Sequence, residues 1–197
     1  MAKSSLLKHG FKAKAERLAL EYRSKLLIEP HGSLDGFDLA AFLEIPIYDA
    51  TEFLNSPLEK ARLAGSGEND CGWSALTMTP ASGRKIIIHN PYHTLPRQQS
   101  NIMHELSHII CGHEEGPRYD FLIPLGMRSF DEVHEEEAKC LGATLQLPRV
   151  SLVWAAKKNM NNFEISEHFN ASIEMVAYRL NTSGVLKQFK YQYIRDK

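Results

Sequence analysis

The chain has 197 residues, of which 43% are hydrophobic and 24% are charged, and its formal net charge is −1 at pH 7. This length and apolar content can bury a real core, as one domain or as one domain with a small appendage. The balanced charge excludes a strong overall attraction to nucleic acid or to an anionic membrane.

Targeting and redox features indicate a cytoplasmic protein. The charged segment from Met1 to Leu27 lacks the apolar core of a signal peptide, and no later stretch reaches the roughly 18 apolar residues of a transmembrane helix. The cysteines are odd in number, so at least one thiol stays unpaired within the chain, as in a reducing compartment. We therefore expect a soluble, cytoplasmic protein with no membrane partner. The cysteines are Cys71, Cys111 and Cys140.

The first part of the chain predicts two helices and a strand. Apolar residues spaced at i, i+4, i+7, i+11 and i+15 indicate an amphipathic helix over residues 11–26. A second, short helix is expected over 37–43, capped by Asp35 or Ser33. Residues 45–48, Ile-Pro-Ile-Tyr, indicate an edge strand because proline cannot donate to a central ladder.

Another turn or two of helix is expected over 57–63, followed by two strands over 73–79 and 84–89. The link Pro80-Ala81-Ser82-Gly83 is short and rich in turn residues, so the two strands are predicted to form a hairpin. If either strand is an exposed edge, an extended polypeptide could pair with it.

The stretch from Ile102 to Ile110 contains a His-Glu-x-x-His motif within an apolar helical pattern. His104 and His108 lie about one helical turn apart, so both imidazoles leave the same face and can bind one zinc ion. Glu105 projects in another direction, where it can act as a general base on a water at the metal. The interleaved isoleucine and leucine residues favour a buried metal helix over a solvated surface helix.

This helix is expected to end at Cys111 and Gly112. A third histidine ligand of the metzincin kind would require Gly three and His six residues after the second motif histidine. Those positions hold Cys111 and Glu114. We therefore expect His113 to be an ordinary loop residue after the helix, and the third ligand to come from elsewhere.

A further helix is predicted from Asp131 to Leu147, and it begins with an acidic cluster. Glu135, Ala138 and Gly142 share one face at i, i+3 and i+7. Two small residues beside a carboxylate would let this helix approach the metal helix closely. A His2Glu set then leaves the fourth zinc position for water, as in catalytic sites. Alternative ligands in the same cluster are Glu136 and Glu137.

The segment 151–197 differs in character and has the pattern of a helix-turn-helix, with Ser172 as the N-cap of the second helix. Only Arg179 and Asn181 suit DNA reading, and Glu174 would oppose phosphate. We expect this segment to pack on the core or to recognise a protein, without binding DNA directly.

The predicted fold class is α+β. Residues 1–150 are expected to form a zincin-like, mainly helical metallopeptidase domain with a small β-sheet beside the metal helix. Residues 151–197 are expected to form the C-terminal helix-turn-helix-like segment.

Several motifs also carry a family resemblance. They are residues 93–98 before the His-Glu-Leu-Ser-His motif, Glu135-x-x-Ala138 with Leu145 and Pro148, the Phe11 to Glu16 opening, and Leu43-x-Ile45-Pro46. Together they resemble the ImmA/IrrE-type metallo-endopeptidases over nearly the whole chain. In that family the acidic motif runs Glu-x-x-Ala-Asn/Asp, which maps the third ligand to Glu135 and places Lys139 at the Asn/Asp position.

The resemblance implies a zinc endopeptidase that cleaves a helix-turn-helix transcriptional repressor and so releases a stress or mobile-element gene programme. Two imidazoles and a carboxylate suit Zn2+, although Mn2+ or Fe2+ can use the same ligands. The ligands would be His104, His108 and Glu135, with Glu105 passing a proton from water to the leaving amine. The candidate oxyanion donors are Tyr92, His93 and Tyr119.

A second class of function is a regulatory binding module that keeps the metal but controls a repressor by contact, without cleavage. Lys139 keeps this alternative open, because the family's Asn or Asp is a polar partner that would orient a histidine ligand. No oligomeric state is assigned from the sequence.

Overall fold

The computed structural model describes residues 6–65, 72–113 and 131–189, and these ranges are mostly helical with one small sheet, which confirms the α+β class. The helices are α1 (Phe11–Lys25), α2 (Gly36–Phe42), α3 (Pro57–Ala64), α4 (Leu95–Cys111), α5 (Glu132–Gln146), α6 (Arg149–Lys157), α7 (Asn162–Phe169) and α8 (Ile173–Thr182). The strands are β1 (Ile47–Asp49), β2 (Ala75–Met78) and β3 (Ile86–His89), and the short 3-10 helix η1 (Ala50–Phe53) follows β1. Cys71, Tyr119 and the loop predicted over 114–130 lie outside the described residues.

The first two helices form where the sequence provides the signals. The buried face of α1 includes Phe11, Ala15 and Ala19, which are spaced by one turn each. Of the two predicted caps of α2, the structure uses Asp35 rather than Ser33, since the Asp35 carboxylate accepts hydrogen bonds from two amides of the first turn. Both helices therefore present an apolar side to the core.

The three strands form one sheet in the order β1-β3-β2. β2 and β3 are antiparallel, with Leu76 opposite Ile88, which confirms the predicted hairpin. β1 runs parallel to β3, with Tyr48 opposite Ile88, and lies at an edge as Pro46 predicted. Ile87 of the central strand β3 is fully buried, at 0% exposure.

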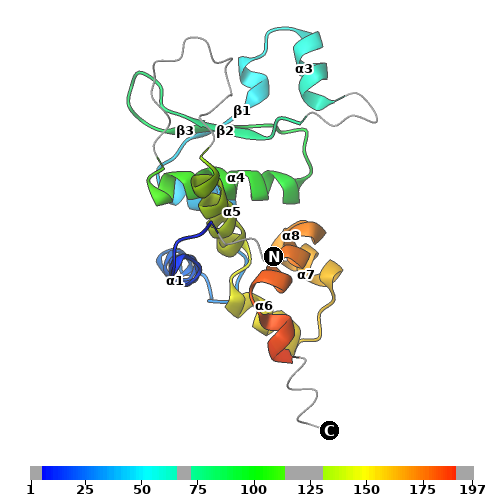
Figure 1. The fold of residues 1–197 in the computed structure, drawn as a ribbon. Coiled ribbons are helices and arrows are strands. Elements are labelled where there is room, and N and C mark those ends of the chain that lie inside the picture. The colour runs from blue at the N-terminus through cyan, green and yellow to red at the C-terminus, as the bar shows by residue number, and fades with distance from the viewer. Residues whose placement is uncertain (1–5, 66–71, 114–130, 190–197) are drawn as a thin grey trace.

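Helix α4 lies between the sheet and α5 (Figure 1). β2 and β3 contact α4, α5 crosses it, and α1 packs against α5. Ile102, Met103 and Leu106 of α4 are fully buried and share one core with Leu141 and Leu145 of α5. Because α4 is packed by several elements, its side chains are held in fixed orientations.

Gly142 determines how closely α5 approaches α4. A Cβ atom at this position would lie 3.0 Å from the carbonyl oxygen of Met103 and 3.1 Å from the amide nitrogen of His104. The close helix crossing predicted from Ala138 and Gly142 is thus confirmed. It leaves no space for a side chain and brings the first turn of α5 to the histidines of α4.

Helices α6, α7 and α8 contribute to a second apolar cluster that includes Leu152, Phe169 and Val176. Asn161 and Ser172 cap α7 and α8 through their side chains, and Ser172 is the predicted cap. Among the described residues, no helix combines the length and the apolar character needed to cross a membrane.

Arg179 connects α8 to the rest of the protein. Its side chain is buried, Nε donates to the carbonyl oxygen of Leu147 at 2.8 Å, and Nη2 donates to a carboxylate oxygen of Glu16 at 2.8 Å. Arg179 is one of the two residues of α8 suited to DNA reading. It is buried and paired with Glu16, so it is not exposed on the surface of α8.

Candidate metal centre

Helix α4 places two imidazoles side by side. The Nε2 atoms of His104 and His108 lie 3.1 Å apart, as expected for side chains one helical turn apart on the same face. His108 is buried, whereas His104 is partly exposed. One imidazole is therefore anchored in the protein and the other borders solvent.

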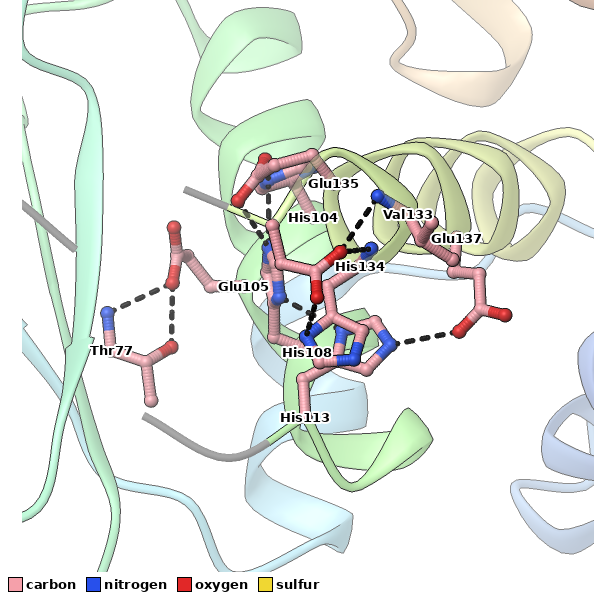
Figure 2. Close-up of polar contacts among 10 residues, drawn as sticks. Thr77, His104, Glu105, His108, His113, Val133, His134, Glu135 and Glu137 are labelled. Carbon is pink, nitrogen blue, oxygen red and sulfur yellow. Dashed lines mark hydrogen bonds and ion pairs between the residues drawn. The ribbon is translucent and has the colours of Figure 1, made fainter. Parts of the chain in front are cut away.

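Helix α5 supplies a carboxylate to this pair. Glu135 Oε2 lies 3.2 Å from His104 Nε2, and Glu135 Oε1 lies 3.4 Å from His108 Nε2 (Figure 2). Each of the three residues offers one potential ligand atom, an imidazole nitrogen or a carboxylate oxygen. These three atoms all lie within 4.8 Å of one another. The close crossing at Gly142 makes this meeting possible, because the three residues come from two helices far apart in sequence.

The side chain of Glu105 points toward Thr77 of the sheet (Figure 2). Its Oε2 accepts two hydrogen bonds from Thr77 of β2, one from the amide nitrogen at 2.8 Å and one from the hydroxyl oxygen at 2.6 Å. Glu105 is only 6% exposed. The strand therefore fixes the carboxylate that the sequence assigned to proton transfer.

A cavity of about 310 Å³ opens beside these residues. His104 and Glu105 form part of its wall, together with Asn101 one turn earlier on α4. The opposite wall is the start of β2 and the residues before it, Gly72, Trp73, Ser74 and Ala75. A substrate in this cavity would touch both a metal-ligand candidate and the candidate base.

The comparison with protein families agrees with this geometry. Residues 58–181 match the peptidase M78 family, described as the IrrE N-terminal-like domain. The chain belongs to this family. The match covers α4 and α5, and it confirms the resemblance that the sequence motifs indicate. No curated protein and no solved structure matches the chain.

Membership of the M78 family makes the chain a candidate metallopeptidase, and the donor set fits that assignment. Two imidazole nitrogens and a carboxylate oxygen are ligands that zinc accepts in catalytic sites, and manganese and iron also use them. His104, His108 and Glu135 are the residues that could hold such an ion.

His113 is a loop residue just beyond the end of α4, as expected, and among the described residues it does not join the possible metal ligands. This residue is buried, its Nδ1 lies 3.0 Å from His108 Nδ1, and its Nε2 lies 3.0 Å from Glu137 Oε2 (Figure 2). Burial lowers the pKa of His113, and the hydrogen bond with Glu137 only partly opposes this effect. His113 is therefore a buried loop residue in contact with a metal-ligand candidate.

A local signal in the sequence could have identified His113. Gly112 adopts a left-handed conformation with φ +71°, its amide bonds to the Ile109 carbonyl, and the His113 amide bonds to the His108 carbonyl. These are the two bonds of a Schellman motif, in which the second residue past the helix end contacts the residue in the last turn. Gly followed by His after the motif helix therefore places His113 against His108.

The alternative acidic ligands behave differently from Glu135. Glu137 is buried against His113 and also lies 3.7 Å from the ammonium of Lys8. In the described part of the chain, neither Glu136 nor Glu137 joins the group of His104, His108 and Glu135. Glu135 and Glu137, two residues apart on α5, thus have different surroundings.

Lys139 marks a departure from the M78 family pattern. Its ammonium lies 5.4 Å from the ring centroid of Tyr178 on α8. This is a cation–π contact between helices. Lys139 thus contacts α8, whereas the residue that contacts the ring of His108 is His113.

The candidate oxyanion donors are not equivalent. Tyr92 is 49% exposed, and Tyr119 lies outside the described residues. His93 is buried, with Nδ1 3.3 Å from Asn101 Nδ2 and Nε2 3.4 Å from Asn90 Nδ2. Asn101, which the sequence reasoning did not select, lines the cavity and is thereby a further polar group near the substrate position.

Proposed function

We propose that this chain is a zinc-dependent endopeptidase. The observation that carries the proposal is the meeting of His104, His108 and Glu135 beside a cavity that also exposes Glu105. A structural metal site would be closed by a fourth protein ligand, whereas three ligands beside a cavity leave a position for water.

The chemistry divides between the ion and the protein. A zinc ion held by the three ligands would polarise the scissile carbonyl and make the attacking water more acidic. Glu105 takes a proton from this water as its oxygen bonds to the carbonyl carbon. It then delivers the proton to the amine nitrogen as the carbon–nitrogen bond breaks. The two bonds from Thr77 keep the Glu105 carboxylate oriented through both transfers.

The substrate that fits this arrangement is an extended polypeptide. β2 is an outer strand of the described sheet, it contacts α4, and the residues leading into it line the cavity. A peptide lying there would run alongside a strand, and backbone pairing binds extended chains with little dependence on sequence. We propose a helix-turn-helix transcriptional repressor as the physiological substrate, on the strength of the ImmA/IrrE resemblance.

The test is cleavage of candidate repressors by purified protein loaded with zinc, with Glu105→Gln as the matched variant. The amide of the substituted side chain keeps a carbonyl oxygen for the Thr77 donors but cannot carry the proton. We expect the variant to bind zinc normally and to lose about 100-fold or more in turnover. A zinc-loaded wild type that leaves a broad peptide library and every repressor intact would contradict the proposal.

The alternative, a binding module that controls a repressor by contact, makes the opposite prediction for the same variant. Repression would then be relieved equally by the wild type and by Glu105→Gln. The observation that favours this alternative is the position of Lys139. Its ammonium lies over the ring of Tyr178 rather than beside a histidine ligand.

A further inference from the structure

We propose that His113 and Glu137 are positioning residues of the metal centre, which together fix the orientation and the proton of the ligand His108. The proposal rests on the proposed metal site but not on peptidase activity. It adds two residues to the three ligands, and it assigns them a role that can be measured on metal binding alone.

His108, His113 and Glu137 form one continuous series of hydrogen bonds in the protein interior, called here the His108–His113–Glu137 relay. His108 Nδ1 lies 3.0 Å from His113 Nδ1, and His113 Nε2 lies 3.0 Å from Glu137 Oε2. His108 and His113 are each 7% exposed, and Glu137 is 5% exposed. Water therefore has little access to these hydrogen bonds, and each side chain depends on the next.

The positions of the protons follow from the role of His108. An imidazole that offers Nε2 to a metal must carry its proton on Nδ1. His108 Nδ1–H then donates to His113 Nδ1, which must present a lone pair. A neutral His113 consequently carries its proton on Nε2 and donates it to the Glu137 carboxylate. All three groups are satisfied in this arrangement, and His108 is left with the lone pair that faces His104 and Glu135.

The backbone at the end of α4 places His113 beside His108. Gly112 in the left-handed conformation turns the chain after α4, so that the His113 amide bonds to the carbonyl of His108. The same two residues are thus joined twice, once through the backbone and once through their rings. The His113 ring is further held by stacking on His134, with ring centroids 4.2 Å apart and planes 13° apart.

Carboxylate partners of metal-binding histidines raise ligand basicity and fix the ring orientation, and their loss costs about 10- to 100-fold in metal affinity. Here the carboxylate acts through an intervening histidine. Glu137 provides it from α5, the helix that also provides Glu135. The same helix crossing therefore brings the ligand Glu135 to one side of His108 and Glu137 to the outer nitrogen of His113.

Zinc affinity, measured by competition with a chromophoric chelator, tests the proposal. We expect His113→Phe and Glu137→Gln each to weaken zinc binding by about 10- to 100-fold. His113→Gln should remain closer to the wild type, because its amide can accept from His108 and donate to Glu137. Glu136→Gln is the matched control on the same helix and should change the affinity less than about twofold, because no ligand depends on it. Apo-protein melting curves show whether each variant folds.

A second measurement, the position of the His108 proton, is made on the wild-type protein and needs no substitution in the relay. In zinc-loaded protein labelled with 15N-histidine, the His108 proton should sit on Nδ1 and exchange slowly with solvent. Protonation of His108 on Nε2 would overturn the proposal, as would variants of His113 and Glu137 that bind zinc like the wild type. A wild type that binds zinc but cleaves nothing refutes the peptidase and leaves this inference standing, whereas one that binds no zinc refutes both.

Discussion

The carboxylate of Glu105 accepts both the amide and the hydroxyl hydrogen bond of Thr77, at 2.8 and 2.6 Å. One residue of the outer strand β2 therefore holds the candidate general base of α4. Because the two bonds converge on the same oxygen, Oε2, they restrict the direction in which the carboxylate can present its other oxygen. The sheet is thus part of the proposed catalytic arrangement and not only a support for it.

Thr77→Val should lower kcat about tenfold while leaving zinc binding unchanged. The substitution keeps the branched shape and the amide but removes the hydroxyl. A hydrogen bond to a charged group contributes about 1.5–3 kcal/mol, and about 1.4 kcal/mol corresponds to a factor of ten in rate. Steady-state kinetics on a cleaved peptide measure the effect. Thr77→Ser is the control and should retain most of the activity; equal rates for the two variants would show that the hydroxyl has no role.

Gly142→Ala should destabilise the protein by about 1–3 kcal/mol, because the new Cβ would lie 3.0 Å from the Met103 carbonyl oxygen and overpack the crossing of α4 and α5. In an open helix the same change would stabilise by up to about 1 kcal/mol. Urea unfolding gives the sign of the change in the free energy of unfolding. A loss of stability supports the close crossing, and a gain contradicts it.

Gly112→Ala should cost about 1–2 kcal/mol, because an L side chain is strained at φ +71°. It should also weaken zinc binding, since the strained turn displaces His113 from His108. Gly83→Ala is matched to it: Gly83 has φ +77°, nothing lies within 4 Å of its Cβ position, and it belongs to the β2–β3 turn. We expect Gly83→Ala to lose a similar amount of stability while its affinity for zinc stays unchanged. Gly112→Asn should recover part of the loss, because asparagine tolerates this conformation.

Glu135→Gln should weaken zinc binding by more than about 100-fold, because it changes a ligand rather than a partner of a ligand. Removal of the metal with a chelator should abolish cleavage by the wild type, and added zinc should restore it. Calorimetry of zinc binding gives the comparison with Glu136→Gln, which should bind like the wild type. Equal losses in the two variants would mean that the acidic cluster acts only through its charge.

Arg179→Met should lower the free energy of unfolding by about 3 kcal/mol, since it removes the ion pair with Glu16 and the donor to the Leu147 carbonyl, although Glu16 keeps its bond from the Arg149 amide. Thermal or urea denaturation measures this change. DNA binding should be absent in both the wild type and the variant, at low as well as physiological salt. Salt-dependent DNA binding that disappears with Arg179 would contradict the placement of this side chain.

The sequence alone determined the features that depend on local periodicity. The four-residue spacing puts His104 and His108 on one helix face. The turn residues between β2 and β3 produce the hairpin, and the small residue Gly142 allows the helix crossing. The α+β class followed from these patterns and the family from the resemblance of the sequence motifs, while the ligand roles of the three residues remain a proposal.

Tertiary structure decided the contacts that join distant segments. Nothing in the spacing of β2 indicates that Thr77 meets Glu105, or that Arg179 turns inward to Glu16. For His113 the two levels combine. The glycine that ends α4 places this histidine against His108 locally, but only the packing of α5 brings Glu137 to its other nitrogen. Periodicity fixes the face from which a side chain leaves its own element, whereas its partner depends on how that element packs against the others.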